Sequence, residues 1–181
     1  MNPHASPINT SRLTLIAATV RHLRTELESY EQLGALLCAA VPSSWPPGLY
    51  DRDAMRFFLE KSLQGGDAVT GWYGWYAIRR EQADQPALLI GSIGYFGPPN
   101  SEGVVEIGYS VVPEERGKGY ATELAEAMMM LAWRDERVGM VVAEAHETNL
   151  ASRGVLEHCG FKMLGAGREE GYLRFGILRT T

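Results

Sequence analysis

The stretch Glu106–Thr122 reads EIGYSVVPEERGKGYAT and passes from a strand pattern into a helix pattern. Its apolar first half ends at Pro113, which has no N–H to continue a central strand ladder. A short loop follows, and a helix is predicted to begin near Gly119 or Tyr120, because apolar residues then recur at helical spacing. The stretch therefore predicts a strand, a tight loop and a helix start.

The loop of this stretch is typical of an anion site. Gly117 and Gly119 allow close approach of the backbone, and the N–H groups at a helix start favour phosphate together with the helix dipole. Arg116 and Lys118 add positive charge. The spacing fits neither the GxxxxGKS/T loop nor the GxGxxG fingerprint. A plain loop with a helix-capping glycine stays open as the alternative for this motif alone.

Strand patterns lie on both sides of this helix. Three segments rich in aromatic and β-branched residues precede it, separated by turn formers: Trp72–Arg79, Ala87–Tyr95 and Gly103–Val112. A strand, a helix and two more strands are predicted after it: Val138–Ala145, Asn149–Cys159, Phe161–Ala166 and Tyr172–Leu178. Short connections favour antiparallel neighbours, whereas a strand–helix–strand crossover gives a parallel pair.

The N-terminal third adds a strand at Leu13–Ile16 and helical periodicity over Val20–Ala40 and Asp53–Leu63. With the later segments, this order predicts an α/β fold: a mixed, mostly antiparallel central sheet with helices on both faces. A chain of 181 residues suits a single domain over residues 1–181. The polar residues 1–11 are expected to form a flexible N-terminus.

The composition narrows the classes of function. A formal charge of −5 argues against a general nucleic-acid binder, which needs Lys and Arg to neutralise phosphates. No run approaches the roughly 20 apolar residues of a membrane span, and residues 1–11 have no apolar core of a signal peptide. Cys38 and Cys159 are interpreted as buried free thiols of an intracellular protein. We expect a cytoplasmic protein with no nucleic-acid or membrane partner and no metal; a homodimer is one candidate assembly.

Two motifs in order resemble a known family. Residues 116–121 (RGKGYA) contain R-x-x-G-x-A after a predicted strand, and residues 149–152 (NLAS) contain N-x-x-S, followed by Gly-Phe at 160–161. Together they resemble the acyl-CoA signature of the GCN5-related N-acetyltransferase (GNAT) superfamily. The resemblance spans residues 12–179 and is closest to the RimJ and RimL type of ribosomal-protein alanine acetyltransferases.

The resemblance implies acetyl-CoA as co-substrate and assigns contacts to it. Val111 and Val112 would offer backbone N–H groups to the thioester carbonyl and the pantetheine. Asn149 would bind the pantetheine, with Ser152 one helical turn further on the same face. The pyrophosphate would be held mainly by main chain, in the segment Arg116, Gly117, Lys118, Gly119, Tyr120, Ala121 and Thr122.

The implied reaction is attack of a primary amine on the thioester in a ternary complex, and it needs a base. An amine with a pKa of about 10.4 is almost wholly protonated at pH 7. Glu106 is the preferred base because it shares a strand face with Gly108 and Ser110, on the strand that ends at the acyl site. Glu144 and His146, on the next strand, are the rivals, and a purely structural glutamate remains the alternative for Glu106.

One position departs from the family pattern. Many members place a tyrosine seven residues after the position of Asn149, where it protonates the leaving thiolate, and this chain has Leu156 there. Ser152 could partly replace that tyrosine. The departure is also the one feature that favours a protein of another class, a non-catalytic acyl-CoA sensor on the same fold.

The acceptor amine is the least defined part of the reaction. Trp45, in the proline-rich loop Ser43–Gly48, is expected to be exposed and to line an acceptor pocket, and Tyr109 is assigned to the same substrate-binding side. The nearest branch favours a protein N-terminus, while small amines, polyamines, amino acids and aminoglycoside-like drugs stay open.

Overall fold

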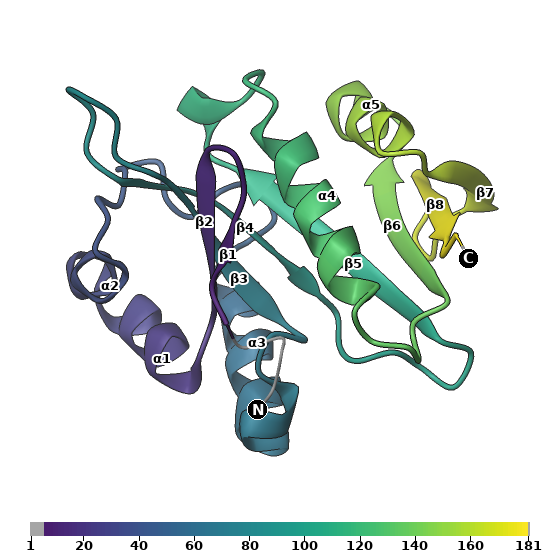
Figure 1. Cartoon of the computed structure of the whole chain (residues 1–181), viewed down its shortest axis with the longest axis horizontal. Coiled ribbons are helices and arrows are strands. Elements are labelled where there is room, and N and C mark those ends of the chain that lie inside the picture. Colours follow the sequence, from purple (N-terminus) through teal and green to yellow (C-terminus); the bar gives the residue numbers. More distant parts are fainter. Residues whose placement is uncertain (1–5, 181) are drawn as a thin grey trace.

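The computed structural model describes residues 6–180, in which eight strands form one sheet in the order β1-β2-β3-β4-β5-β6-β8-β7 (Figure 1). The strands are β1 (Ile8–Asn9), β2 (Leu13–Ala17), β3 (Gly74–Arg79), β4 (Leu88–Tyr95), β5 (Val104–Val111), β6 (Met140–His146), β7 (Lys162–Ala166) and β8 (Tyr172–Leu178). The helices are α1 (Val20–Glu28), α2 (Tyr30–Leu37), α3 (Arg52–Gly65), α4 (Tyr120–Ala132) and α5 (Leu150–His158), with short 3-10 turns η1 (Gly66–Val69) and η2 (Pro113–Glu115). None of the helices in this part of the chain has both the length and the apolar character of a membrane span.

Helices cover both faces of the sheet. On one face, Tyr76 of β3 donates its hydroxyl to Glu26 of α1 (2.6 Å), and α3 packs beside α1. On the other face, Tyr95 of β4 donates to the carbonyl of Met128 in α4, and α5 packs beside α4. We name these the α1/α3 face and the α4/α5 face. The predicted mixed sheet with helices on both faces is confirmed.

The sheet opens between its two halves. β5 and β6 are parallel neighbours, whose pairing joins Val104–Ile107 to Met140–Ala143. Beyond these residues β5 continues to Val111 along β4, and β6 continues to His146 along β8. The two strands therefore part toward their C-terminal ends (Figure 1), and we call this opening the strand divergence.

The segment with helical periodicity over Val20–Ala40 forms two helices, α1 and α2. Ser29 between them has an extended backbone (φ −157°, ψ 119°), and its N–H donates to the Thr25 carbonyl at the end of α1 (2.7 Å). Its hydroxyl accepts a hydrogen bond from the N–H of Gln32 (3.3 Å) and so caps α2. The predicted helical periodicity is confirmed, and the serine ends one helix and starts the next because its hydroxyl offers the backbone a competing partner.

The N-terminal segment adds an edge strand. β1 pairs antiparallel with β2, with Ile8 opposite Leu15 and Asn9 opposite Thr14. Residues 1–5 of the expected flexible N-terminus lie outside the described residues. The later part of that segment is paired with the sheet, next to the residues that contact α4.

Candidate active site

Helix α4 begins without a side-chain cap. The other α-helices of residues 6–180 each follow a residue whose side chain accepts a backbone hydrogen bond: Thr19, Ser29, Asp51 and Asn149. At α4 that position is Gly119, and the N–H of Glu123 donates to its carbonyl (3.2 Å). The N–H groups of Tyr120, Ala121 and Thr122 therefore have no helical acceptor. Free donors at the positive end of a helix dipole favour an anion.

The loop before α4 is open on its outer side. Gly117 and Gly119 have φ angles of 72° and 81°, a left-handed conformation that glycine adopts without strain. A Cβ on Gly117 would meet nothing within 4 Å, and one on Gly119 would lie 3.4 Å from the Arg12 guanidinium. The loop backbone is thus accessible at the residues for which the sequence predicts pyrophosphate binding.

The side chains of the two loop cations turn back onto the protein. Arg116 donates from Nε to the Val111 carbonyl (2.9 Å), and Lys118 pairs with Glu115 (3.0 Å). Both residues remain exposed. They contribute positive charge to the loop while stabilising its shape.

An ion pair that the sequence analysis missed ties α4 to the N-terminal strands. Arg12 donates from Nε to Glu123 (2.7 Å) and from Nη1 to the Lys118 carbonyl (2.8 Å). Glu123 also accepts hydrogen bonds from the hydroxyls of Thr10 and Ser11. Against the opposing effect of burial, these hydrogen bonds lower the pKa of Glu123 to about 2. The two partners are 111 positions apart, so local sequence pattern gives no signal of the pair.

Backbone donors of β5 border the strand divergence. The N–H of Val112 donates to the Ile90 carbonyl (2.9 Å) within the sheet, which corrects the expectation that it meets the thioester. In an antiparallel ladder the N–H groups of successive residues point to opposite sides. Those of Tyr109 and Val111 therefore point away from β4, toward the divergence. The predicted donor role is compatible with this register for Val111 alone.

Helix α5 carries the second motif of the sequence. Asn149 is exposed and caps the helix, since its side chain accepts from the N–H of Ser152 (3.1 Å). The Tyr109 hydroxyl lies 3.1 Å from the Ser152 hydroxyl and 3.2 Å from its carbonyl, so it joins β5 to α5. Tyr109 thus lies on the α4/α5 face, opposite Glu106, which corrects its assignment to the acceptor side. Burial raises the pKa of Tyr109 to about 12.

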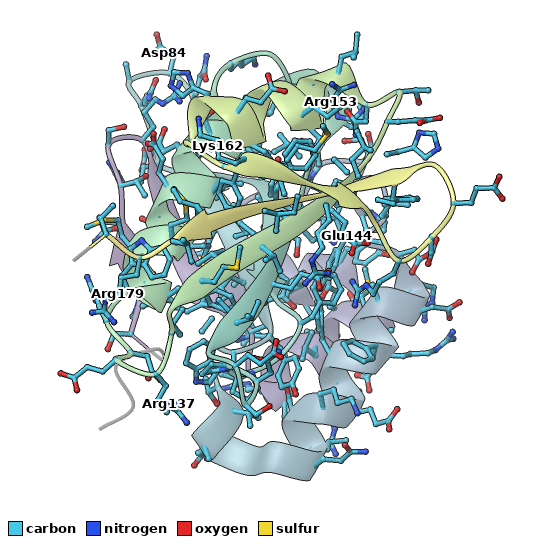
Figure 2. All side chains as sticks on the ribbon, turned by 90° about the vertical axis from the view of Figure 1, so that its right-hand side faces the viewer. Asp84, Arg137, Glu144, Arg153, Lys162 and Arg179 are labelled. Atoms are coloured by element: carbon cyan, nitrogen blue, oxygen red, sulfur yellow. The ribbon has the colours of Figure 1, made fainter. Side chains whose placement is uncertain are left out.

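Both candidate carboxylates lie together on the α1/α3 face. Glu106 pairs with Arg168 and lies 4.0 Å from Arg174. Glu144 lies 3.0 Å from Arg174 and 3.4 Å from Arg168. The two glutamate side chains are 13% and 10% exposed. Figure 2 shows Glu144 on one side of the strands at this end of the sheet and Arg153 of α5 on the other.

Of the two carboxylates, Glu106 is better suited to take a proton. Burial raises its pKa above the ordinary value, Arg168 and Arg174 oppose the rise, and Glu144 adds to it. Glu144 is held more firmly, because it also accepts from the backbone N–H of Arg168 (3.2 Å). A carboxylate with a raised pKa is a stronger base near neutral pH.

His146, the third candidate base, is the last residue of β6, and its side chain contacts the turn that follows. Its Nδ1 accepts from the N–H of Thr148 (3.3 Å) and lies 2.8 Å from the Thr148 hydroxyl. Its ring meets the Tyr172 ring edge-on, at 5.2 Å between centroids. These contacts are those of a histidine that stabilises a turn.

Trp45 is buried, contrary to the expectation of an exposed acceptor contact. Its indole N–H donates to Glu26 (2.9 Å), which also accepts from the hydroxyls of Tyr50 (2.8 Å) and Tyr76 (2.6 Å). Trp45 is 4% exposed and Glu26 only 1%. The indole therefore fixes the proline-rich loop to α1 instead of facing a substrate.

Two residues that the sequence analysis did not single out flank β5 on the α1/α3 face. A Cβ on Gly48 would lie 3.3 Å from the Ser110 hydroxyl, so the proline-rich loop touches the end of β5. Phe96 is 51% exposed and lies over Gly108, where a Cβ would meet its ring at 3.1 Å. The backbone of this loop and the Phe96 ring are thus positioned to contact an acceptor that approaches Glu106.

Comparison with known proteins agrees with this geometry. A family model described as an acetyltransferase (GNAT) domain matches residues 13–162. The uncharacterized N-acetyltransferase YjdG of Bacillus subtilis (strain 168) is 26% identical over 154 residues, which cover 85% of this chain and 88% of that protein.

Solved structures share the fold at lower identity. The RimL ribosomal L7/L12 alpha-N-protein acetyltransferase in complex with coenzyme A has a TM-score of 0.66 at 16% identity, covering 96% of this chain and 98% of that one. The ribosomal-protein-S5-alanine acetyltransferase from Vibrio fischeri has a TM-score of 0.65 at 14% identity, covering 96% of each chain. Because the family model matches most of the sequence and these structures share its fold, the chain belongs to the acetyltransferase (GNAT) family.

Proposed function

We propose that the protein is an N-acetyltransferase that passes the acetyl group of acetyl-CoA to a primary amine by direct attack in a ternary complex. The observation that carries this proposal is the two-sided strand divergence. Free helix N–H groups lie on its α4/α5 side, at the start of α4, and two carboxylates lie on its α1/α3 side. A donor held on one side and an acceptor held on the other would meet at the opening.

The donor would bind first through its phosphates. Its pyrophosphate would accept hydrogen bonds from the N–H groups at the start of α4, and its thioester would lie in the strand divergence beside Val111. As negative charge develops on the thioester oxygen, the Val111 N–H would stabilise it. One such donor contributes about 2.7–4 kcal/mol in comparable sites. The coenzyme A in the RimL complex supports the choice of co-substrate.

The amine would approach on the α1/α3 side. Glu106 would accept its proton while the C–N bond forms and the C–S bond breaks, and coenzyme A would leave as a thiolate. Arg168, which pairs with Glu106 here, is 62% exposed and can be displaced into solvent at small cost. An N-terminal α-amine is the first acceptor to test, because similar structures are named for ribosomal-protein acetylation.

Calorimetric titration of the purified protein with acetyl-CoA tests the donor site, with ATP as the control. Micromolar affinity, about −8 kcal/mol, for acetyl-CoA and none for ATP is expected. Release of the coenzyme A thiol would then be followed with a panel of peptides, polyamines and aminoglycosides. Binding without release for any amine would favour the acyl-CoA sensor.

Glu106→Gln tests the base. We expect transfer to slow by about 10²–10⁴-fold, the usual contribution of a general base, with acetyl-CoA affinity unchanged. Glu144→Gln should have the smaller effect. Glu102→Gln, on the exposed turn before β5, is the matched control and should leave the rate unchanged. A larger loss for Glu144→Gln would transfer the role of base to that residue.

A further inference from the structure

An arginine of the same chain lies where the proposed acceptor amine would have to bind. Arg168 belongs to the turn 167–171 between β7 and β8. Its guanidinium pairs with Glu106 and lies 3.4 Å from Glu144. Arg174 of β8 lies 3.0 Å from Glu144 and 4.0 Å from Glu106. Two cations therefore balance the two carboxylates, and each cation lies against both of them.

The two arginines differ in how firmly they are held. The Arg174 side chain extends from a strand and is 32% exposed, whereas the Arg168 side chain extends from a turn and is 62% exposed. An ion pair of an exposed side chain is weak, because solvent screens the charges. The guanidinium of Arg168 is therefore the cation that another positive group can replace.

The backbone of the turn is held independently of that guanidinium. The N–H of Gly167 donates to the Tyr172 carbonyl (2.7 Å), which closes the turn between the two strands. The N–H of Arg168 donates to the Glu144 carboxylate (3.2 Å). Release of the guanidinium therefore needs only rotation about side-chain bonds, and the turn keeps its place beside Glu144.

We propose that the Arg168 guanidinium holds the place of the acceptor's ammonium group, and that the acceptor binds as a cation by displacing it. This inference rests on the function proposed above. Of the cations that the structure describes, only Arg174 then stays within 4.0 Å of the two carboxylates. One negative charge is left for the ammonium to balance. The site therefore selects an alkyl amine, which is positively charged at neutral pH, over a neutral acceptor such as an alcohol.

The exchange of one cation for another makes and breaks no covalent bond. The bound ammonium then loses one proton to water, which exposes the nitrogen lone pair. Glu106 accepts the second proton as the C–N bond forms and the C–S bond breaks. Arg168 is thus a specificity-determining residue: a molecule enters only if its charge can replace the guanidinium.

The test uses butylamine as a probe and does not depend on the identity of the natural acceptor. At about pH 7.5 butylamine is almost wholly an ammonium cation, and butanol is its neutral counterpart. The reporter is the carboxyl carbon resonance of Glu106 in the NMR spectrum, identified as the signal that Glu106→Gln lacks. At constant ionic strength, butylammonium should shift this resonance saturably in the unchanged protein, and butanol should not.

Arg168→Ala removes the resident cation. This variant should bind butylammonium about twofold to fivefold more tightly, which is the competition expected from an exposed ion pair. Arg168→Lys, which keeps a positive charge, should bind the probe as the unchanged protein does. Arg137→Ala is the matched control, because Arg137 is 67% exposed and pairs with Asp135 (2.6 Å), whose side chain is 14% exposed. It should leave the affinity for butylammonium unchanged.

A pH titration of the same resonance gives a readout that a merely structural Arg168 would not move. In residues 6–180, the charged groups that face Glu106 are Arg168 of the turn, Arg174 of β8 and Glu144 of β6. Without the probe, Arg168→Ala should raise the pKa of Glu106, because it removes a cation beside the carboxylate. With saturating butylammonium the variant and the unchanged protein should titrate alike, because the same cation then lies beside Glu106 in both.

The outcomes separate this inference from the proposed function. The absence of a saturable shift with butylammonium, an equal shift with butanol, or the same affinity and the same Glu106 pKa in Arg168→Ala would overturn the exchange of cations. Failure of the unchanged protein to bind acetyl-CoA would instead overturn the proposed function, since the measurements with butylamine do not involve the acetyl donor.

Discussion

Replacing Glu26 by alanine tests how the proline-rich loop Ser43–Gly48 is held. The carboxylate is 1% exposed and accepts hydrogen bonds from Trp45 (2.9 Å), Tyr50 (2.8 Å) and Tyr76 (2.6 Å). Trp45 lies in the proline-rich loop, Tyr50 lies just after that loop, and Tyr76 lies in β3. Without the carboxylate, three buried donors lose their acceptor at once.

The magnitude follows from that count. A buried donor left without a partner costs about 1–3 kcal/mol, so three independent donors would cost about 3–9 kcal/mol. The losses share one site, and water can enter the space that the carboxylate vacates, so the lower part of this range applies. We expect Glu26→Ala to lower the free energy of unfolding by about 3–5 kcal/mol, a large part of the usual total of 5–15 kcal/mol for a domain.

The pH dependence gives a second, signed test. Burial raises the pKa of Glu26, against the hydrogen bonds from Tyr76, Tyr50 and Trp45. Because the folded state then holds the proton more tightly than the unfolded state, the group contributes its stability below the unfolded pKa. That contribution is lost as the pH rises through the folded pKa. The advantage of the unchanged protein over Glu26→Gln, which stays neutral, should therefore shrink as the pH rises.

Urea unfolding followed by far-UV circular dichroism measures both effects. Glu28→Ala, on the exposed side of the same helix, is the control and should change the free energy of unfolding by less than about 0.5 kcal/mol. A loss below about 1 kcal/mol for Glu26→Ala would refute the reasoning that the three donors depend on this carboxylate. An advantage over Glu26→Gln that grows with pH would show that hydrogen bonding outweighs burial.

Three further outcomes are expected. Gly119→Glu should abolish acetyl-CoA binding in calorimetry, because it strains a φ of 81° and places negative charge at the phosphate site; unchanged affinity would exclude that site. Gly94→Ala should destabilise by more than about 3 kcal/mol in urea unfolding, because its Cβ would lie 2.2 Å from a backbone carbonyl, whereas Gly154→Ala, with open space around it, should stabilise by about 0.5–1 kcal/mol. Cys38 is exposed, contrary to the expectation that both thiols are buried, so iodoacetamide at about pH 8 should modify it and spare Cys159, whose pKa burial raises to about 11; mass spectrometry of the two peptides checks this.

Local sequence pattern predicts those helices and strands whose stabilising contacts come from residues nearby in the sequence or on the neighbouring strand. The start of α4 after Gly119 and the strands around it follow from local period and turn residues. The sequence also contains a signal for the break between α1 and α2 at Ser29, because Ser29 and Gln32 have the spacing of a helix N-cap signature. The helical spacing of apolar residues continues across Ser29, so that spacing alone does not show the break.

The parts of the site that could not be predicted depend on distant pairs. Trp45 looks like an exposed loop aromatic until Glu26, 19 positions earlier, is seen to accept its N–H. The Arg168 side chain meets Glu106 across 62 positions, and Tyr109 meets Ser152 across 43. Each contact joins elements whose relative position is set by the sheet order, which a single sequence does not state.

The register of β5 links these observations. Successive side chains of a strand point to opposite faces, so Glu106 and Tyr109, an odd number of residues apart, lie on opposite sides of the strand divergence. A slip of one residue against β4 would exchange every side chain of β5 between the faces and move the proposed base, Glu106, to the α4/α5 face. Gly91 of β4 allows β5 to approach closely in this register, since a Cβ on it would lie 2.5 Å from the Ser110 carbonyl. The close backbone packing that glycine allows in β4 is therefore as necessary to the proposed reaction as the carboxylate that β5 presents.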